Sequence, residues 1–468
     1  MDATFSPKLA PINAIPPLDV LRQILELASH GSCHDHPSFC RPVVRSDRII
    51  TSITHSLCRD VPDPLLLSHV CSRWRNLILD TPTMWASVFI SSPRNHQIHL
   101  LNLWLERSQK CALDIIFDYS SSFGYRSFKA VVKLLAANAE RCTGFEFKAR
   151  DKVRRDMPGT FGEFIPPGRF NALKKISTFF STEDKAFLDD FAVTFFAPGS
   201  PDLRVCRLTE PQTLSIIPQI NPTWSHNLTS LTLFAFDDLS ILPLISNSPS
   251  LISLTLGFSI CEADPEQLAV MVTLPELRYL ILRHLQESNF ILDWLTLPQL
   301  RNLSTVDSLC DGETAPAVWA ALHGMLERSK CSLKYFSLIH QKTNMTKEEF
   351  LIEQLASQNF SALTDLELVQ KDMGNTIVEA LTTPSAGNDK SPSHEILPKL
   401  ETLGLMFCST DDGKLGLMVS SRFRKGKGTL KHIMLGTRGD EYSHFFDREV
   451  LLKLEEEGLT FRWTPGLI

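Results

Sequence analysis

Cysteine and histidine, residue types that bind zinc, crowd a short stretch near the N-terminus of this chain. The stretch contains Cys33, His34, His36, Cys40, His55 and Cys58. Thiolate and imidazole groups can hold zinc in a tetrahedral site, but the paired Cys-x-x-Cys spacing that presets this geometry is missing. We therefore expect a loop here, with no metal site and no cofactor.

Two basic runs could bind an anion. Arg150–Asp156 (RDKVRRD) carries its own acidic residues and is typical of a solvated face. Arg422–Lys427 (RFRKGK) has no stacking aromatic residue beyond Phe423. We expect this second run to contact an acidic patch on a protein partner rather than nucleic acid.

Motifs for catalysis are missing from the sequence. It contains no Gly-x-Ser-x-Gly elbow, no His-Glu-x-x-His helix and no Gly-x-Gly-x-x-Gly turn. A hydrolase with an unfamiliar site is therefore the weakest hypothesis. We expect a binding protein and not an enzyme.

The composition is that of a folded protein with more than one core. The chain has 468 residues, of which 43% are apolar and 21% charged. A net charge of −6 argues against nucleic-acid binding. No apolar run approaches the roughly 18 residues of a membrane span, and no charged-then-apolar leader opens the sequence. With eleven scattered cysteines, this predicts reduced thiols in a cytoplasmic and/or nuclear protein that binds no membrane.

Two apolar helices are predicted near the N-terminus, at Ile12–Ser29 and from Pro64 onward. Asp63-Pro64 is typical of an N-cap followed by proline at the first helical position. The second segment has apolar residues at helical spacing and then a Thr81-Pro82 break before Trp85. The apolar sides of these two helices are too wide to be buried within so small a segment, so we expect them to pack against a partner surface.

These segments resemble the F-box, the helical module by which substrate receptors dock the Skp-type adaptor of cullin–RING ubiquitin ligases. The match rests on Ile15-Pro16-Pro17 and on the run from Val70-Cys71-Ser72-Arg73-Trp74 to Trp85. The chain departs from the family where Leu18-Asp19 follows the prolines, and where His30–Pro64 replaces a short turn. Interrupted modules of this kind are similar to the F-box-like domains common in mushroom-forming fungi.

The resemblance implies that the N-terminal helices bind the adaptor and, through it, the cullin–RING ligase. By this resemblance, the adaptor-binding residues are Pro16, Leu21, Ile24, Leu25, Leu66, Val70, Cys71, Trp74 and Leu77. Trp74 is the expected anchor, since interface energy concentrates in a few buried aromatic residues. We expect Trp85 to brace the module against a helix at Ile98–Arg107.

The rest of the chain repeats the pattern L-x-x-L-x-L. Clear copies are Leu228/Leu231/Leu233, Leu251/Leu254/Leu256, Leu277/Leu280/Leu282, Leu363/Leu366/Leu368 and Leu400/Leu403/Leu405. Looser copies are Cys142/Phe145/Phe147, Leu173/Ile176/Phe179, Leu203/Cys206/Leu208, Leu300/Leu303/Val306, Leu333/Phe336/Leu338 and Leu430/Ile433/Leu435. Each copy predicts a short strand followed by a helical or irregular return, for example Pro265–Met271 or Lys347–Ser357.

This region resembles an irregular leucine-rich-repeat solenoid. The Asn or Cys that the family carries beyond the third leucine is matched only by Cys408. The predicted fold is therefore α/β: a small all-α N-terminal F-box-like module, then short parallel strands alternating with helices. An ordinary α/β domain whose strands happen to begin with leucine is the alternative.

The expected organisation has four parts. Residues 1–11 form a tail, and residues 12–92 the F-box-like domain with an inserted loop at 30–64. Residues 93–140 form a joining helix–strand–helix segment, and residues 141–468 the solenoid, with a mobile loop at 382–395. The helix Ile98–Arg107, the strand Leu113–Phe117 and the helix Phe128–Asn138 are predicted in the joining segment.

The leading functional hypothesis is a substrate-recognition subunit that holds an unidentified protein target on its repeats. The alternative is a leucine-rich-repeat scaffold whose N-terminal helices only cap the array.

Overall fold

A computed structural model describes residue 21 and residues 64–91, 98–119, 125–149, 159–180, 185–196, 201–208, 222–236, 241–258, 271–283, 290–306, 315–340, 348–383, 396–423, 429–437 and 444–464. Their contacts divide the chain into two compact units, Met1–Lys148 and Ala149–Ile468. Within the described residues, the insert at 30–64 is represented only by Pro64. The cysteines and histidines between residues 33 and 58, the run Arg150–Asp156 and most of the loop 382–395 lie outside them.

The first unit begins with helices and then alternates strands with helices. Its elements are α3 (Pro64–Ser68), α4 (Ser72–Leu79), the 3-10 helix η2 (Pro82–Trp85), β1 (Ser87–Ser91), α5 (Ile98–Arg107), β2 (Leu113–Tyr119), α6 (Tyr125–Asn138), the 3-10 helix η4 (Ala139–Arg141) and β3 (Cys142–Ala149). The predicted helix at Ile98–Arg107 is confirmed with the same bounds. The predicted strand and second helix of the joining segment are also confirmed, each slightly longer than expected.

Strand β1 was not expected. It follows Trp85 after a single residue and pairs in parallel with β2, Val88 opposite Ile115. The helical part of the range 12–92 therefore ends at Trp85, and the remainder enters the sheet. The short helices α3, α4 and η2 and the alternating sheet are continuous in the chain, with a single residue between η2 and β1.

The second unit alternates parallel strands with helices. Its strands are β4 (Lys175–Phe180), β5 (Val205–Leu208), β6 (Ser230–Phe236), β7 (Ser253–Phe258), β8 (Val272–Thr273), β9 (Tyr279–Arg283), β10 (Leu295–Thr296), β11 (Asn302–Val306), β12 (Tyr335–His340), β13 (Asp365–Met373), β14 (Thr402–Cys408), β15 (His432–Thr437) and β16 (Thr460–Thr464). Its helices are α7 (Thr160–Phe164), α8 (Lys185–Phe196), the 3-10 helix η7 (Pro222–Asn227), α9 (Ile241–Ser246), α10 (Phe290–Trp294), α11 (Ala315–Ser329), α12 (Glu348–Leu355), the 3-10 helix η9 (Gln358–Phe360), α13 (Asn375–Leu381), α14 (Lys414–Arg422) and α15 (Phe445–Glu456).

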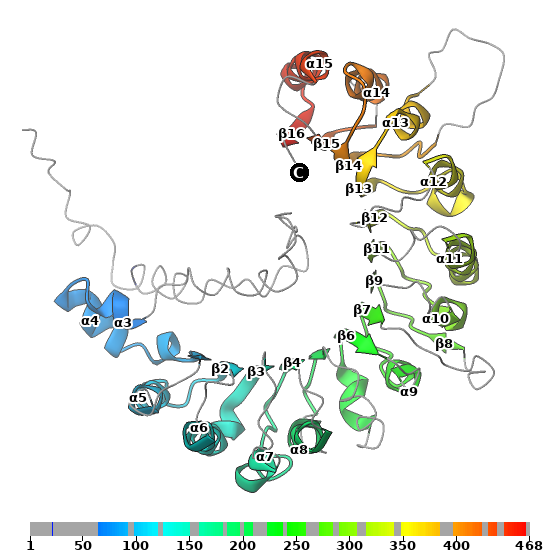
Figure 1. Cartoon of the computed structure of the whole chain (residues 1–468). Helices are drawn as coiled ribbons and strands as arrows, with labels where there is room; N and C mark the ends of the chain where they lie inside the picture. The colour runs from blue at the N-terminus through cyan, green and yellow to red at the C-terminus, as the bar shows by residue number, and fades with distance from the viewer. Residues whose placement is uncertain are drawn as a thin grey trace, which may run out of the picture. The chain divides into compact units, whose positions relative to one another are not determined.

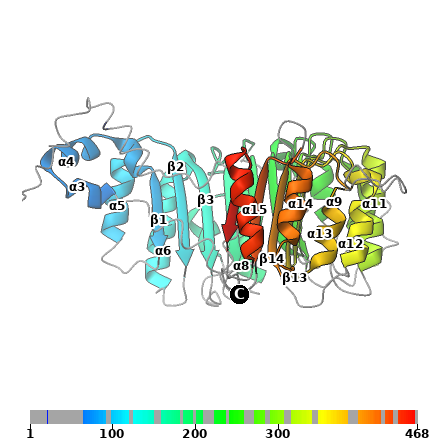
Figure 2. The ribbon, with the colours of Figure 1, turned by 90° about the horizontal axis from the view of Figure 1, so that it is seen from above.

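The strands of this unit lie side by side in chain order from β4 to β16, with β8 and β10 forming a separate short pair. The described helices pack along one face of the sheet, and none of them lies on the other face, the open face (Figure 1). The axes of the helices and of the strands are roughly aligned (Figure 2). The predicted α/β alternation is confirmed. Of the two returns expected to be helical or irregular, Lys347–Ser357 contains α12, and Pro265–Met271 falls almost wholly outside the described residues.

The repeated leucines form continuous rows across the sheet. Leu231 lies opposite Leu254, Leu254 opposite Leu280, and Leu280 opposite Leu303. These side chains are buried, at most 1% exposed. Because successive strand residues point to opposite faces, one leucine in every second position suffices to build this core.

Two of the looser copies were assigned one residue too late. The third inward position of β11 is Thr305, which lies opposite Leu282 and is fully buried, whereas Val306 faces the open side. Likewise Thr178 is buried in β4, whereas Phe179 is 40% exposed. Threonine is accepted in the core row because its hydroxyl has a backbone acceptor: Thr305 Oγ1 donates to the Ser337 carbonyl at 3.4 Å.

Candidate functional site

The predicted adaptor-binding residues are divided between the core and the surface of the first unit. Leu21 and Leu77 are buried in a core cluster with Ile78, Met84 and Trp85. Trp74 packs against this cluster and is partly buried. The inward residues stabilise the module itself and are not free to meet an adaptor.

Trp85 fastens the helical segment to α5. Its indole Nε1 donates to the Ile78 carbonyl at 2.9 Å. Its ring meets Trp104 edge to face at 4.9 Å between centroids, and the Arg107 guanidinium carbon lies 4.5 Å from the ring centre. The expected bracing of Trp85 against the helix Ile98–Arg107 is thus confirmed.

The turn between α3 and α4 leaves apolar surface exposed. Val70 is 60% exposed, and the half-buried Cys71 caps α4, its Sγ accepting the Trp74 backbone N–H at 3.5 Å. Of the predicted docking residues, this turn therefore exposes Val70 and part of Cys71 and Trp74. The side chain of Leu66, together with Pro16, Ile24 and Leu25, lies outside the described residues.

The open face of the second sheet carries aromatic and charged side chains. Tyr335 donates its hydroxyl to the Glu367 carboxylate at 2.6 Å, and Ser337 donates to the same oxygen at 3.3 Å. Desolvation, followed by the charge of Glu367, raises the pKa of Tyr335. The phenol therefore stays protonated and holds Glu367 in place on the neighbouring strand.

A second polar–aromatic group lies across β6, β7 and β9. The Arg283 guanidinium carbon sits 5.2 Å from the centre of the Phe234 ring. Gly257 on the intervening strand makes room for that ring, since a Cβ there would lie 2.6 Å from Phe234. Phe234 and Tyr335 thus each contact a charged side chain on the same face. Aromatic residues and arginine are enriched in protein interfaces.

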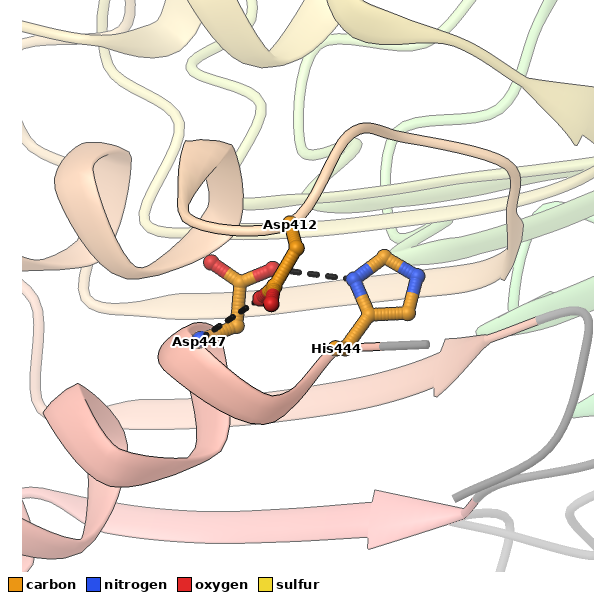
Figure 3. A group of neighbouring side chains, drawn as sticks. All are labelled: Asp412, His444 and Asp447. Atoms are coloured by element: carbon orange, nitrogen blue, oxygen red, sulfur yellow. Dashed lines mark hydrogen bonds and ion pairs between the residues drawn. The ribbon is translucent and has the colours of Figure 1, made fainter. Parts of the chain in front are cut away.

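One group of potential metal ligands occurs in the described residues: Asp412, His444 and Asp447 (Figure 3). Sequence analysis did not find it, because Asp412 lies far from the other two in the chain. His444 Nδ1 pairs with Asp447 Oδ2 at 2.9 Å, and both side chains are almost wholly buried. The three ligand atoms lie within 4.8 Å of one another.

The carboxylates of this group cap helices. Asp412 accepts the backbone N–H groups of Phe446 at 3.1 Å and Asp447 at 3.0 Å, in the first turn of α15. Asp447 accepts the Gly416 N–H in the first turn of α14 at 2.6 Å. All four carboxylate oxygens therefore accept hydrogen bonds within the protein, so the group is a structural link between two helix ends.

The run Arg422–Lys427 differs from expectation at its first residue. Arg422 is buried and points inward, donating to the carbonyls of Leu381, Leu397 at 3.1 Å and Ile396 at 2.6 Å. It therefore ties together the two described ends of the segment 382–395 and does not contribute to an anion-binding surface. Residues 424–428 lie outside the described part of the chain.

No protein-family model and no curated protein matches the sequence. The cysteines in the described residues are all free thiols. None of the helices that the structure describes has the length and hydropathy needed to span a membrane.

Proposed function

We propose that this chain is the substrate-recognition subunit of an SCF-type cullin–RING ubiquitin ligase. The α3–α4 turn of the first unit docks the Skp-type adaptor, and the open sheet face of the second unit holds a protein target. The chain performs no chemistry in this role. It raises the effective concentration of target at the ligase by binding both.

The observation that carries the proposal is the exposed apolar surface at the α3–α4 turn. Val70 is 60% exposed directly before Cys71, in the part of the sequence that most resembles the F-box. The half-buried Trp74 lies one turn further along α4. Tryptophan is enriched among the residues that dominate interface energy, and Val70 adds apolar surface beside it for a partner to cover.

The side chains on the open face of the second unit support the binding of a protein target there. Its side chains include Tyr335, Glu367, Phe234 and Arg283, which are held in fixed positions by contacts with one another. Tyrosine and arginine are enriched among residues that dominate interface energy. Preorganised side chains lose less conformational freedom on binding.

The packing of Trp85 on α5 favours the second candidate function. In it the chain is a scaffold outside any ligase, and its N-terminal helices only cap the repeats. Trp85 packs on Trp104 and Arg107 of α5, so the helices already cover the first helix of the alternating series. Capping requires only this inward packing and no further partner.

Capture of the adaptor separates the two functions. We expect the full chain to retain a Skp-type adaptor, and Val70→Asp to abolish the capture, because a charge would be buried in an apolar contact. The matched control is Phe89→Asp on β1, which is 55% exposed in the same unit and outside the predicted docking set. Trp74→Ala/Leu77→Ala is a weaker test, since Leu77 belongs to the core.

The receptor function is supported if the wild type and Phe89→Asp retain the adaptor and Val70→Asp does not. Failure of a folded wild-type chain to retain the adaptor overturns it and leaves the capped scaffold. Equal loss in both variants also overturns the assigned surface. Folding of each variant is checked by circular dichroism.

A further inference from the structure

The open face of the second unit carries positive charge over the seven neighbouring strands β4, β5, β6, β7, β9, β11 and β12. None of these strands contains an aspartate or a glutamate. The residues that alternate with the buried row lie on the open face, and three of them are the cations Lys175, Arg207 and Arg283.

The residue directly before each of these strands adds to the charge. In five of the seven cases it is an exposed cation: Lys174, Arg204, Arg278, Arg301 and Lys334. The Arg301 backbone N–H donates to the Arg278 carbonyl at 3.1 Å, and the Lys334 N–H donates to the Arg301 carbonyl at 2.8 Å. These residues therefore precede adjacent strands, which lie about 4.8 Å apart. The five cations and the three on the strands form the cationic face.

Most of this charge has no acidic partner in the part of the chain that the structure describes. Lys334 donates to a backbone carbonyl at 3.4 Å, and Arg283 lies over an aromatic ring. The other six cations form no side-chain hydrogen bond or ion pair with a described residue. Two exposed acidic residues, Asp202 and Glu276, each lie two residues before one of the cations. Positive charge thus prevails on this face of a chain with a net charge of −6, and it attracts anionic partners.

We propose that the cationic face binds an extended acidic segment of a protein target. This inference names the kind of target that the open face holds, and to that extent it rests on the proposed function. Seven strands span about 29 Å from first to last, which is the length of about nine residues of an extended chain. Carboxylates along such a segment meet cations on successive strands, and complementary charge fixes the register of a complex and speeds its association.

The uncharged residues among the cations suit a peptide better than a nucleic acid. Tyr279, Asn302 and Tyr335 lie opposite one another on β9, β11 and β12 and are partly exposed. An asparagine amide both donates and accepts hydrogen bonds, so Asn302 can bind a peptide group. Val306 and Ile339 are also opposite one another and partly exposed. They offer apolar contacts that side chains of a protein use and phosphate groups do not.

The cationic face ends at β13, where carboxylates appear. Asp365 lies opposite Tyr335, and Glu367 lies opposite Ser337. Thr364 donates to Asp365 at 2.6 Å, and the hydroxyls of Tyr335 and Ser337 donate to Glu367. Carboxylates held at these positions repel an acidic segment that extends past β12, so the bound segment covers β4 to β12.

Fluorescence anisotropy of a labelled peptide with the full chain tests the proposal. The probe is a peptide of about nine residues, the length of the face, in which glutamate alternates with serine. Its counterpart has glutamine in place of glutamate. We expect the glutamate peptide to bind at least about tenfold more tightly than the glutamine peptide, and added salt to reduce the difference. Arg278→Glu/Arg301→Glu should raise the Kd of the glutamate peptide by at least about tenfold, because two attractions become repulsions.

The matched control is Lys399→Glu/Lys453→Glu. Both positions are exposed and lie outside the cationic face, and the change of net charge is the same. We expect its Kd to stay within about twofold of the wild-type value, and circular dichroism checks the folding of both variants. Equal affinity for the two peptides overturns the proposal, and so does an equal loss in the two double variants. An oligothymidylate of equal charge that binds more tightly than the glutamate peptide also overturns it, because the face would then belong to a nucleic acid.

The result is separable from that of the adaptor capture. The peptide assay contains no adaptor, and we expect Arg278→Glu/Arg301→Glu to retain the Skp-type adaptor as the wild type does. A chain that binds the glutamate peptide but no adaptor supports the cationic face and overturns the receptor function. A chain that retains the adaptor but does not prefer the glutamate peptide overturns this inference alone.

Discussion

Asp447 on α15 and Gly416 on α14 join the last two helices that the structure describes through one buried hydrogen bond. The Asp447 Oδ1 atom accepts the Gly416 backbone N–H at 2.6 Å, and its Oδ2 atom pairs with His444. The approach is close because position 416 has no side chain: a Cβ there would lie 3.1 Å from Val450 Cβ and 3.3 Å from Asp447 Oδ1. The start of α14 is thus capped by a residue of α15, and the start of α15 is capped by Asp412, two residues before α14.

Asp447→Ala should destabilise the second unit by about 2–4 kcal/mol, because it removes a helix cap and leaves the buried His444 without its partner. Urea unfolding of the full chain measures the change. Glu455→Ala is the control, an exposed residue on the same helix, for which we expect a change within about 0.5 kcal/mol. Equal losses in the two variants would contradict the capping role.

Arg422→Met should destabilise the second unit by at least about 3 kcal/mol, because it leaves three backbone carbonyls without their hydrogen-bond donor. The carbonyls belong to Leu381, Ile396 and Leu397 on the two sides of the segment 382–395. Arg207→Met, an exposed position on β5, is the matched control in the same unfolding assay. If Arg422→Met left stability unchanged, the inward position of the guanidinium would be wrong.

Leu77→Ala should destabilise the first unit by about 2–5 kcal/mol, as expected for a leucine removed from a packed core. Val70→Ala, at the exposed turn between α3 and α4, should change stability by no more than about 0.5 kcal/mol. Thermal unfolding followed by fluorescence distinguishes them, because Trp74 and Trp85 pack in or against that core. A similar loss for both would show that Val70 is also internal and would weaken the docking surface.

Cys408 should resist alkylation in the folded chain. Burial, then the charges of Asp447 and Glu348, raises the pKa of its thiol from the ordinary 9.0 to about 12. At about pH 8, iodoacetamide should modify the half-buried Cys71 and Cys111 well before Cys408, since the thiolate is the nucleophile. Peptide mass spectrometry reads the order, and rapid labelling of Cys408 without denaturant would contradict it.

The same shift sets a dependence of stability on pH. The folded state keeps the Cys408 proton up to about pH 12, whereas the unfolded chain releases it near 9.0. Between these values the folded state binds more protons, so this residue lowers the free energy of unfolding as pH rises. Comparison of the wild type with Cys408→Ala between pH 8 and 10 isolates this contribution, and identical pH profiles would contradict it.

The strands and helices were predictable where the apolar period was unbroken. The helix at Ile98–Arg107 and the strands that contain Leu231, Leu254 and Leu280 follow from local spacing. Thr178 and Thr305 were missed because a pattern of apolar residues does not anticipate a hydroxyl with a carbonyl acceptor on the next strand. Strand β1 was missed because its short run directly follows Trp85 and was assigned to the helical module.

By itself, the sequence determined the alternation of strands and helices and the leucines of the inner row of the sheet, because these depend on periods of two and of about 3.6 residues along the chain. Only the tertiary structure decided which functional candidates face inward. Leu77 and Arg422 are buried, Val70 is exposed, and Asp412 reaches the first turn of α15. Such choices depend on which distant segments pack together, and residue spacing within one segment carries no information about that.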